Sequence, residues 1–203
     1  MKKNFATLTA SVLVSIAPYA LASSSTELTV TGTITPSACT PTLSTNNIDY
    51  GKIPAKSLNL TQATYLPETS LQFAVSCDAT TPMAFKLVDN NSTQVGGFLS
   101  LGKTPADEPI GAANLVFSNP VADTVPVAVS HSKDNGQNWF STLYLTPDNL
   151  HAPSVPGNWG VPIPSQQFST GLTVKSFIYP AQTLTLTEDV PLDGNATIQI
   201  EYL

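Results

Sequence analysis

Hydrophobic and polar residues alternate along several short stretches of this chain. The clearest case lies near the start, where Leu28, Val30, Gly32 and Ile34 alternate with a glutamate and threonines. Successive side chains of an extended strand point to opposite faces, so these four residues share one face. The pattern predicts a strand with one apolar face. Its glycine is unusual there, because glycine weakens a strand interior unless another backbone or side chain approaches closely.

Further strands are expected wherever β-branched, aromatic and alternating residues recur. Turn clusters at residues 89–92 and 193–195 separate several of them, and segments with a helical period of 3.6 are scarce. The expected strands are residues 71–77, 83–89, 125–130, 138–145, 173–179, 182–187 and 196–203. This succession predicts an all-β sandwich in one domain.

Residues 146–165 break the pattern, because this stretch contains five prolines. Proline cannot donate to the ladder of a central strand. The segment is therefore expected to be a long irregular connection or a decoration at a sheet edge.

The first residues are typical of a secretory signal peptide. Lys2 and Lys3 precede an apolar run that ends in Ala20, Leu21 and Ala22. Cleavage is expected before residue 23. The remainder then divides into an N-terminal extension, residues 23–35, and a β-sandwich domain, residues 36–203.

Charge and cysteine content narrow the function classes. After removal of residues 1–22, six lysines and no arginine face 14 acidic residues, a net charge of −8. This balance argues against nucleic acid and anionic membranes as partners, since both attract clustered basic residues. Cys39 and Cys77 are the only cysteines, and in an exported chain they predict a structural disulfide. Two thiols without further cysteine or a nearby histidine make a poor zinc site.

The first apolar-faced strand has two interpretations. It can belong to its own sandwich, which explains Leu28, Val30 and Ile34 well and is favoured by periodicity alone. A strand donated to another subunit explains Gly32 as well. At the other end of the chain, residues 196–203 alternate Ile198, Ile200 and Tyr202. No later segment is available to cover the edge of this last strand, and open edges invite pairing with another chain.

Taken in order along the chain, these features resemble the pilin subunits of the bacterial chaperone and usher pathway. The resemblance rests on the signal peptide, the short alternating extension with Gly32 before the first cysteine, the cysteine spacing and the penultimate Tyr202. It looks closest to a fimbrial-like branch of uncharacterised function, judging from ELTVTGTITPSAC, IDYGKIPAKSLN and SLQFAVSCD. It covers both ends of the chain well and residues 90–170 poorly.

The resemblance implies an incomplete immunoglobulin-like sandwich that is completed by a donor strand from another subunit. Leu28, Val30, Gly32 and Ile34 would be the donated positions. Ile198, Ile200 and Tyr202 would lie on the strand beside the acceptor groove, which pairs with a periplasmic chaperone before assembly. The implied function is a structural subunit of a cell-surface fimbria, with the chaperone, an outer-membrane usher and other pilin subunits as partners. Gly194 lies closer to the last strand than the corresponding glycine of such subunits, which leaves the length of that strand open.

Enzymatic motifs are weak, and no catalytic residue, cofactor or metal is expected. Residues 132–139 match the S-x-D-x-G-x-x-W pattern of sialidase propellers, but a single copy cannot build a propeller and no arginine is present to clamp a carboxylate. A hairpin turn at residues 134–136 is the preferred interpretation. His131 and His151 occur in no metal-ligand or nucleophile motif.

The alternative to a fimbrial subunit is a self-contained, secreted, lectin-like adhesin or binding module. Its recognition surface would be the aromatic and proline-rich middle of the chain, and a host or surface glycan would be its ligand. Four aromatic residues could contribute, although in a sandwich they are more often core: Trp139, Tyr144, Trp159 and Phe168. A donor segment favours the fimbrial subunit, since an adhesin at a fibre tip does not need one.

Overall fold

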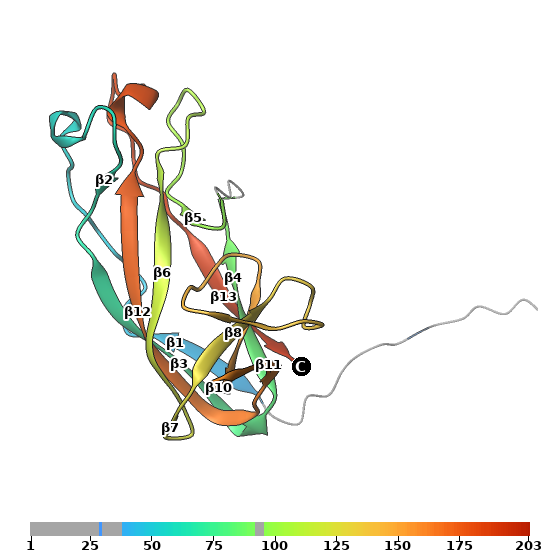
Figure 1. Ribbon diagram of the computed structural model, residues 1–203. Helices are drawn as coiled ribbons and strands as arrows, with labels where there is room; N and C mark the ends of the chain where they lie inside the picture. The colour runs from blue at the N-terminus through green and yellow to red at the C-terminus, as the bar shows by residue number, and fades with distance from the viewer. Residues whose placement is uncertain (1–28, 30–37, 92–95) are drawn as a thin grey trace, which may run out of the picture. The chain divides into compact units, whose positions relative to one another are not determined.

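Alternating stretches of the chain pair into two antiparallel sheets that face each other, as the computed structural model shows (Figure 1). The structure describes Thr29, residues 38–91 and residues 96–203. The expected signal peptide and the four expected donor positions lie outside the described residues. The described β-rich part belongs to one compact unit, Thr35–Leu203.

The larger sheet has the strand order β1-β3-β12-β6-β5, with β2 paired to β12 and β7 to β6. Two of its strands, β12 and β6, are long and strongly curved (Figure 1). The bounds of its strands are β1 Cys39–Leu43, β2 Thr64–Tyr65, β3 Thr69–Thr81, β5 Leu99–Ser100, β6 Gly111–Ala122, β7 Val125–Pro126 and β12 Ser165–Ile178.

The smaller sheet has the order β13-β4-β10-β8-β9, with β11 paired to β10. Its strands are β4 Met83–Asp89, β8 Ala128–Ser132, β9 Phe140–Thr142, β10 Leu150–Val155, β11 Asn158–Pro162 and β13 Ala196–Tyr202. Two short 3-10 turns, η1 Ala55–Ser57 and η2 Ala181–Thr183, complete the elements. No helix in the described part of the chain is long and apolar enough to span a membrane.

The core forms where the inward faces of the two sheets meet. Phe73 and Phe168 of the larger sheet and Phe85 of the smaller one are almost completely buried. The ring centroids of Phe73 and Phe85 lie 5.0 Å apart in an edge-to-face arrangement, and those of Phe85 and Phe168 lie 5.4 Å apart. Such aromatic contacts add about 1 kcal/mol each to the burial of the rings.

One lateral side of the sandwich is closed by the backbone itself. After β9, residues 143–145 cross from the smaller sheet to β6 of the larger one. There the N–H of Phe117 donates to the carbonyl of Leu143, and the N–H of Leu145 donates to that of Leu115, at 2.8 and 2.9 Å. Because β9 and β6 lie far from β13 and β1 in their sheets, this closed side is opposite the pair of edge strands β1 and β13.

Most of the expected strands are present, and the prediction of an all-β fold is confirmed. The stretch 83–89 is β4, residues 71–77 lie within β3, and 196–203 contains β13. The hairpin interpretation of residues 132–139 is also confirmed, since β8 pairs with β9 across that turn. Asn135 and Gly136 there have φ angles of 56° and 87°, which suit asparagine and glycine.

Two predictions were wrong. Residues 182–187 form no strand: η2 is followed by an irregular segment that makes no ladder within the described chain, although its leucines alternate as expected. The proline-rich stretch is not an irregular connection, because its first half is β10, which lies between β4 and β8; only its second half, the largely exposed β11, resembles the expected decoration at a sheet edge. Pro153 fits in β10 because the ladder to β4 stops at His151, so the missing N–H removes no bond to β4.

Candidate functional site: an open groove beside the last strand

The two edge strands β1 and β13 contact each other across the sandwich, on the side opposite residues 143–145. At one end they are tied together, because the backbone N–H of Cys39 donates to the Tyr202 hydroxyl at 3.0 Å. Cys39 is also disulfide-bonded to Cys77, its cross-strand neighbour on β3. The predicted disulfide is thereby confirmed, and it indicates an exported protein.

Beyond this tied end the two edges separate. Strand β1 ends at Leu43, and the chain continues without regular structure, while β13 extends back to Ala196. A groove of about 410 Å³ opens between the sheets at this point. We call it the edge groove. The residues that line it include core leucines of both sheets and two residues of β13: Leu71, Leu87, Leu115, Leu172, Ala196 and Ile198.

The edge groove lies directly over the hydrophobic core. Leu87 and Leu172 are almost fully buried, yet both line its wall. Ile198 and Ile200 of β13 pack against the core but are only partly buried, unlike the inward residues of β3 and β4. Strand β13 is paired with β4 on one side only, so its other edge has free backbone donors and acceptors in the described chain. This combination suits the addition of an extended segment.

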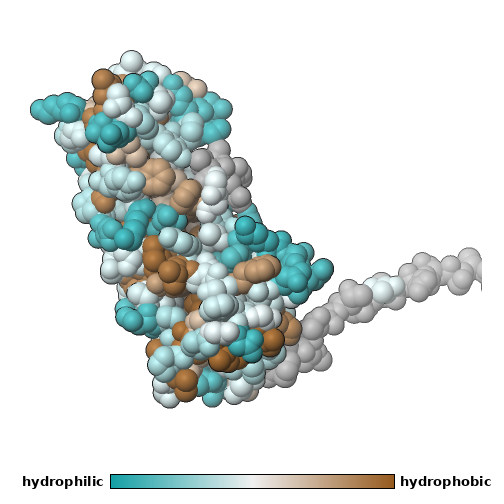
Figure 2. Space-filling view, viewed as in Figure 1, coloured by the Kyte–Doolittle hydropathy of each residue, from teal (hydrophilic) through white to brown (hydrophobic). Residues whose placement is uncertain are grey.

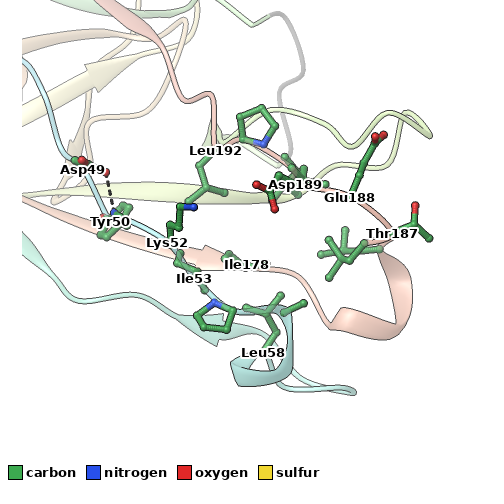
Figure 3. Close-up of a pocket in the computed structure, with 18 of the residues that line it drawn as sticks. Asp49, Tyr50, Lys52, Ile53, Leu58, Ile178, Thr187, Glu188, Asp189 and Leu192 are labelled. Carbon is green, nitrogen blue, oxygen red and sulfur yellow. Dashed lines mark hydrogen bonds between the residues drawn. The ribbon is translucent and has the colours of Figure 1, made fainter.

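A second cavity of about 790 Å³ adjoins the first, and Ile48, Tyr50 and Leu192 line both. We call it the end pocket. It lies over Ile110 and Ile178, near the ends of β6 and β12, where two irregular segments, 48–55 and 184–192, take the place of strands. Figure 3 shows Ile53 of the first segment and Leu192 of the second on either side of Ile178, and Leu58, which follows the first segment, lies on the side of Ile53. Lys52, Glu188 and Asp189 are exposed at its rim.

Glu108 braces the wall 184–192. Its carboxylate accepts hydrogen bonds from the N–H of Thr185 at 2.6 Å and from the Thr185 hydroxyl at 2.9 Å. The hydroxyl of Thr104 donates to it as well, at 2.9 Å. These hydrogen bonds, with that from the Thr185 backbone the largest contribution, lower the pKa of the Glu108 carboxyl. On the facing wall, Tyr50 donates its hydroxyl hydrogen to Ser176 of β12 at 3.0 Å.

The residues predicted for the last strand lie together as one row. Ile198 and Ile200 point toward the core, and Tyr202 is at the tied end of β13 with 44% of its surface exposed. Gly194 lines the edge groove just before the strand, with the side chain of Leu101 so close that a Cβ would come within 3.1 Å of it.

The two histidines are neighbours in the smaller sheet and line neither cavity; His151 is fully buried and His131 is partly buried. His131 on β8 is directly opposite His151 on β10, and the two ring centroids are 6.3 Å apart. Burial, followed by the charge of His131, lowers the pKa of His151 to about 4. Among the described residues, no cluster of three or more histidine, cysteine or acidic side chains could hold a metal ion.

The aromatic residues considered for sugar binding divide into two pairs. Trp139 and Phe168 are core residues, and the indole N–H of Trp139 donates to the carbonyl of Gly136 in the β8–β9 turn. Tyr144 and Trp159 are exposed, at 46% and 43%. Figure 2 shows apolar residues gathered in patches among hydrophilic ones on the face in view.

Sequence reasoning missed both walls of the end pocket. Their alternation was visible, in Leu184 and Leu186 and in Ile48 and Tyr50, but alternation alone predicts a paired strand. What distinguishes these segments is the absence of a ladder partner in the described chain, which depends on the lengths of the two sheets. Strands β12 and β6 of the larger sheet extend past the strands of the smaller sheet at this end (Figure 1).

Comparison with known proteins finds a family of unknown function and one distant relative, and neither is named as a pilin. Residues 28–98 match a family described as "Protein of unknown function (DUF1120)". That match spans the alternating extension, both cysteines and the first wall of the end pocket. The whole chain is 24% identical to Protein GltF of Escherichia coli strain K12, over an alignment that covers 99% of that protein.

Proposed function

We propose that this protein is a non-enzymatic structural subunit of a bacterial surface fimbria, which polymerises by donor-strand complementation after chaperone-assisted export. The observation that carries the proposal is the edge groove, which opens into the core beside the unpaired edge of β13. In a complete sandwich another strand would occupy this place. The alternating segment at residues 28–34 has the length and the apolar face to fill it.

The lengths and chemistry of the two partners agree. β13 has seven residues, Ala196–Tyr202. The segment 28–34 is equally long and presents Leu28, Val30 and Ile34 on one face. Burial of three such side chains contributes on the order of 5 to 8 kcal/mol before the cost of ordering the segment. Before assembly, a periplasmic chaperone would supply an equivalent strand to the same edge, and an outer-membrane usher would exchange it.

Thermal unfolding of a chain of residues 36–203, alone and with a peptide of residues 23–35, tests the proposal. The expected result is an unstable chain whose melting temperature rises strongly with the peptide. A peptide carrying Val30→Asp and Ile34→Asp serves as the control, because it keeps the backbone but loses the apolar face. A chain that melts cooperatively at high temperature and ignores both peptides would contradict the proposal.

A second candidate, a carbohydrate-binding module, draws support from the exposure of Tyr144 and Trp159, since aromatic faces on a surface suit the apolar faces of sugars. Binding to an array of glycans, compared between the protein and a Tyr144→Ala, Trp159→Ala double variant, tests it. Loss of a reproducible glycan signal in the variant supports the module, and no signal from either protein rejects it.

A further inference from the structure

We propose that the end pocket receives part of a second copy of this chain, namely the junction between the donated segment and the folded domain of the donating subunit. This inference rests on the proposed function and adds the contact that follows strand donation. It assigns a role to the larger cavity, which a seven-residue strand paired along β13 does not reach.

The direction of the donated strand follows from the sheets. Every ladder between the named strands of both sheets is antiparallel. An added strand that keeps this rule runs from the Tyr202 end of β13 toward Ala196. Paired over seven residues, it places Leu28 near Tyr202 and Ile34 near Ala196. Its continuation then points away from the disulfide and toward the end pocket, which begins at Leu192.

The length of the chain between the donated segment and β1 determines which part of the donating subunit lies at the end pocket. Only residues 35–38 separate Ile34 from Cys39, where β1 of the donating domain begins. Five residue steps span at most about 18 Å, so the donating domain must start beside the pocket. Thr35 precedes Pro36, and the residue before a proline prefers an extended backbone. This preference favours a straight continuation of the chain toward the end pocket.

The pocket has the chemistry of a protein contact. Leu186, Val190 and Ile53 pack against its small core and are only partly buried. The two walls are irregular segments with alternating apolar side chains, and they pair with no strand of the described chain. Lys52, Glu188 and Asp189 form a charged rim around this apolar floor. An apolar centre with a polar rim is the usual anatomy of a protein–protein interface.

Binding of two different ligands to the same acceptor protein distinguishes this inference from the proposed function. The acceptor is the chain of residues 23–203 with Ile34→Asp, which cannot supply its own donor strand and is immobilised on a surface. The ligands are the peptide 23–35, which carries only the strand, and the unsubstituted chain 23–203, which carries strand, junction and domain. Acceptors with Leu186→Asn or the nearly isosteric Val190→Thr are compared with a control acceptor carrying Leu143→Asn, on the opposite closed side.

The expected result is at least a tenfold loss of affinity for the whole chain in the Leu186→Asn acceptor and a smaller loss in the same direction for Val190→Thr. Peptide affinity should stay within twofold in both, and the control should change neither ligand. Equal losses for chain and peptide, or no loss for either, would overturn the inference while leaving the proposed function intact. A peptide that fails to bind the Ile34→Asp acceptor would overturn both. Circular dichroism of each acceptor confirms that it is folded.

Discussion

The hydroxyl of Tyr202, near the end of β13, accepts a hydrogen bond from the backbone N–H of Cys39, the first residue of β1, at 3.0 Å. The two residues lie on the edge strands of two different sheets. Together with the Cys39–Cys77 disulfide, this bond ties β13 to β1 and β3 at one end of the open side. The edge groove begins where this tie ends.

Removal of this hydroxyl should loosen the tied end. Tyr202→Phe leaves the Cys39 N–H without its protein acceptor, and we expect a loss of about 1 kcal/mol in the free energy of unfolding. Urea denaturation measures the loss. Tyr65→Phe is the matched control, since Tyr65 is 77% exposed and should be unaffected. Equal stability of Tyr202→Phe and the unsubstituted protein would show that water replaces the bond at no cost.

The disulfide should contribute more. It closes a loop with a sequence separation of 38, for which the chain-entropy model gives about 4 kcal/mol. Reduction with dithiothreitol, or a Cys39→Ser, Cys77→Ser double variant, should lower the unfolding free energy by up to that amount. The reductant should have no further effect on the double variant. A reduced protein as stable as the oxidised one would mean that the rest of the fold already restrains β1.

Acid should destabilise the protein through His151. The folded pKa, about 4, lies below the ordinary 6.5, so protons bind more tightly to the unfolded chain. The penalty is absent above about pH 7, grows as the pH falls through 6.5, and levels off below 4. At its limit it amounts to roughly 3 kcal/mol, at 1.36 kcal/mol for each unit of pKa.

Urea unfolding between pH 7 and pH 5 measures this slope in a window where most carboxyl groups stay ionised. A His151→Gln variant, which keeps a hydrogen-bond acceptor but does not titrate, should have a flatter profile. Identical slopes for the two proteins would assign the acid sensitivity to other groups. Direct titration of the His151 ring by NMR then measures the pKa of this histidine in the folded protein.

Gly111 should tolerate no side chain. A Cβ at this first residue of β6 would lie 2.9 Å from the Cα of Ile178 and would overlap the carbonyl oxygen of Phe177 even more closely. The neighbours are backbone atoms of β12 and cannot yield cheaply, so Gly111→Ala should cost about 1 to 3 kcal/mol. Gly160→Ala is the control, because nothing lies within 4 Å of its Cβ position. Chemical denaturation of both variants tests the difference.

The strands that were easiest to predict from sequence alternate clearly and form a ladder without a register shift. Residues 83–89 and 196–203 became β4 and β13, which pair with each other residue for residue from Met83 to Asp89. β6 was missed because GAANLVFSNPVA contains small residues, two asparagines and a proline. Asn119, with a φ of 49°, lies at an irregularity in the ladder with β12 that a propensity argument does not anticipate.

The groove was harder to predict than the strands, because it depends on where pairing ends. Ile198 and Ile200 have the alternation of ordinary core residues, but they lie on an edge strand and stay partly buried, and the groove opens beside Ile198 beyond the stop of β1 at Leu43. The end pocket depends likewise on the length of β12 compared with the strands of the facing sheet. Such differences arise from the whole topology rather than from any local run of residues.

The crossing at residues 143–145 joins the two sheets by backbone hydrogen bonds along one side of the sandwich. Its backbone hydrogen bonds to β6 hold the two sheets together there, while on the opposite side the edge strands β1 and β13 share no ladder. The proposed donor strand would enter on the opposite, open side, away from these hydrogen bonds. Core residues near this closed side, such as Leu145, do not line the edge groove, so the proposed exchange of donor strands would leave their contacts in place.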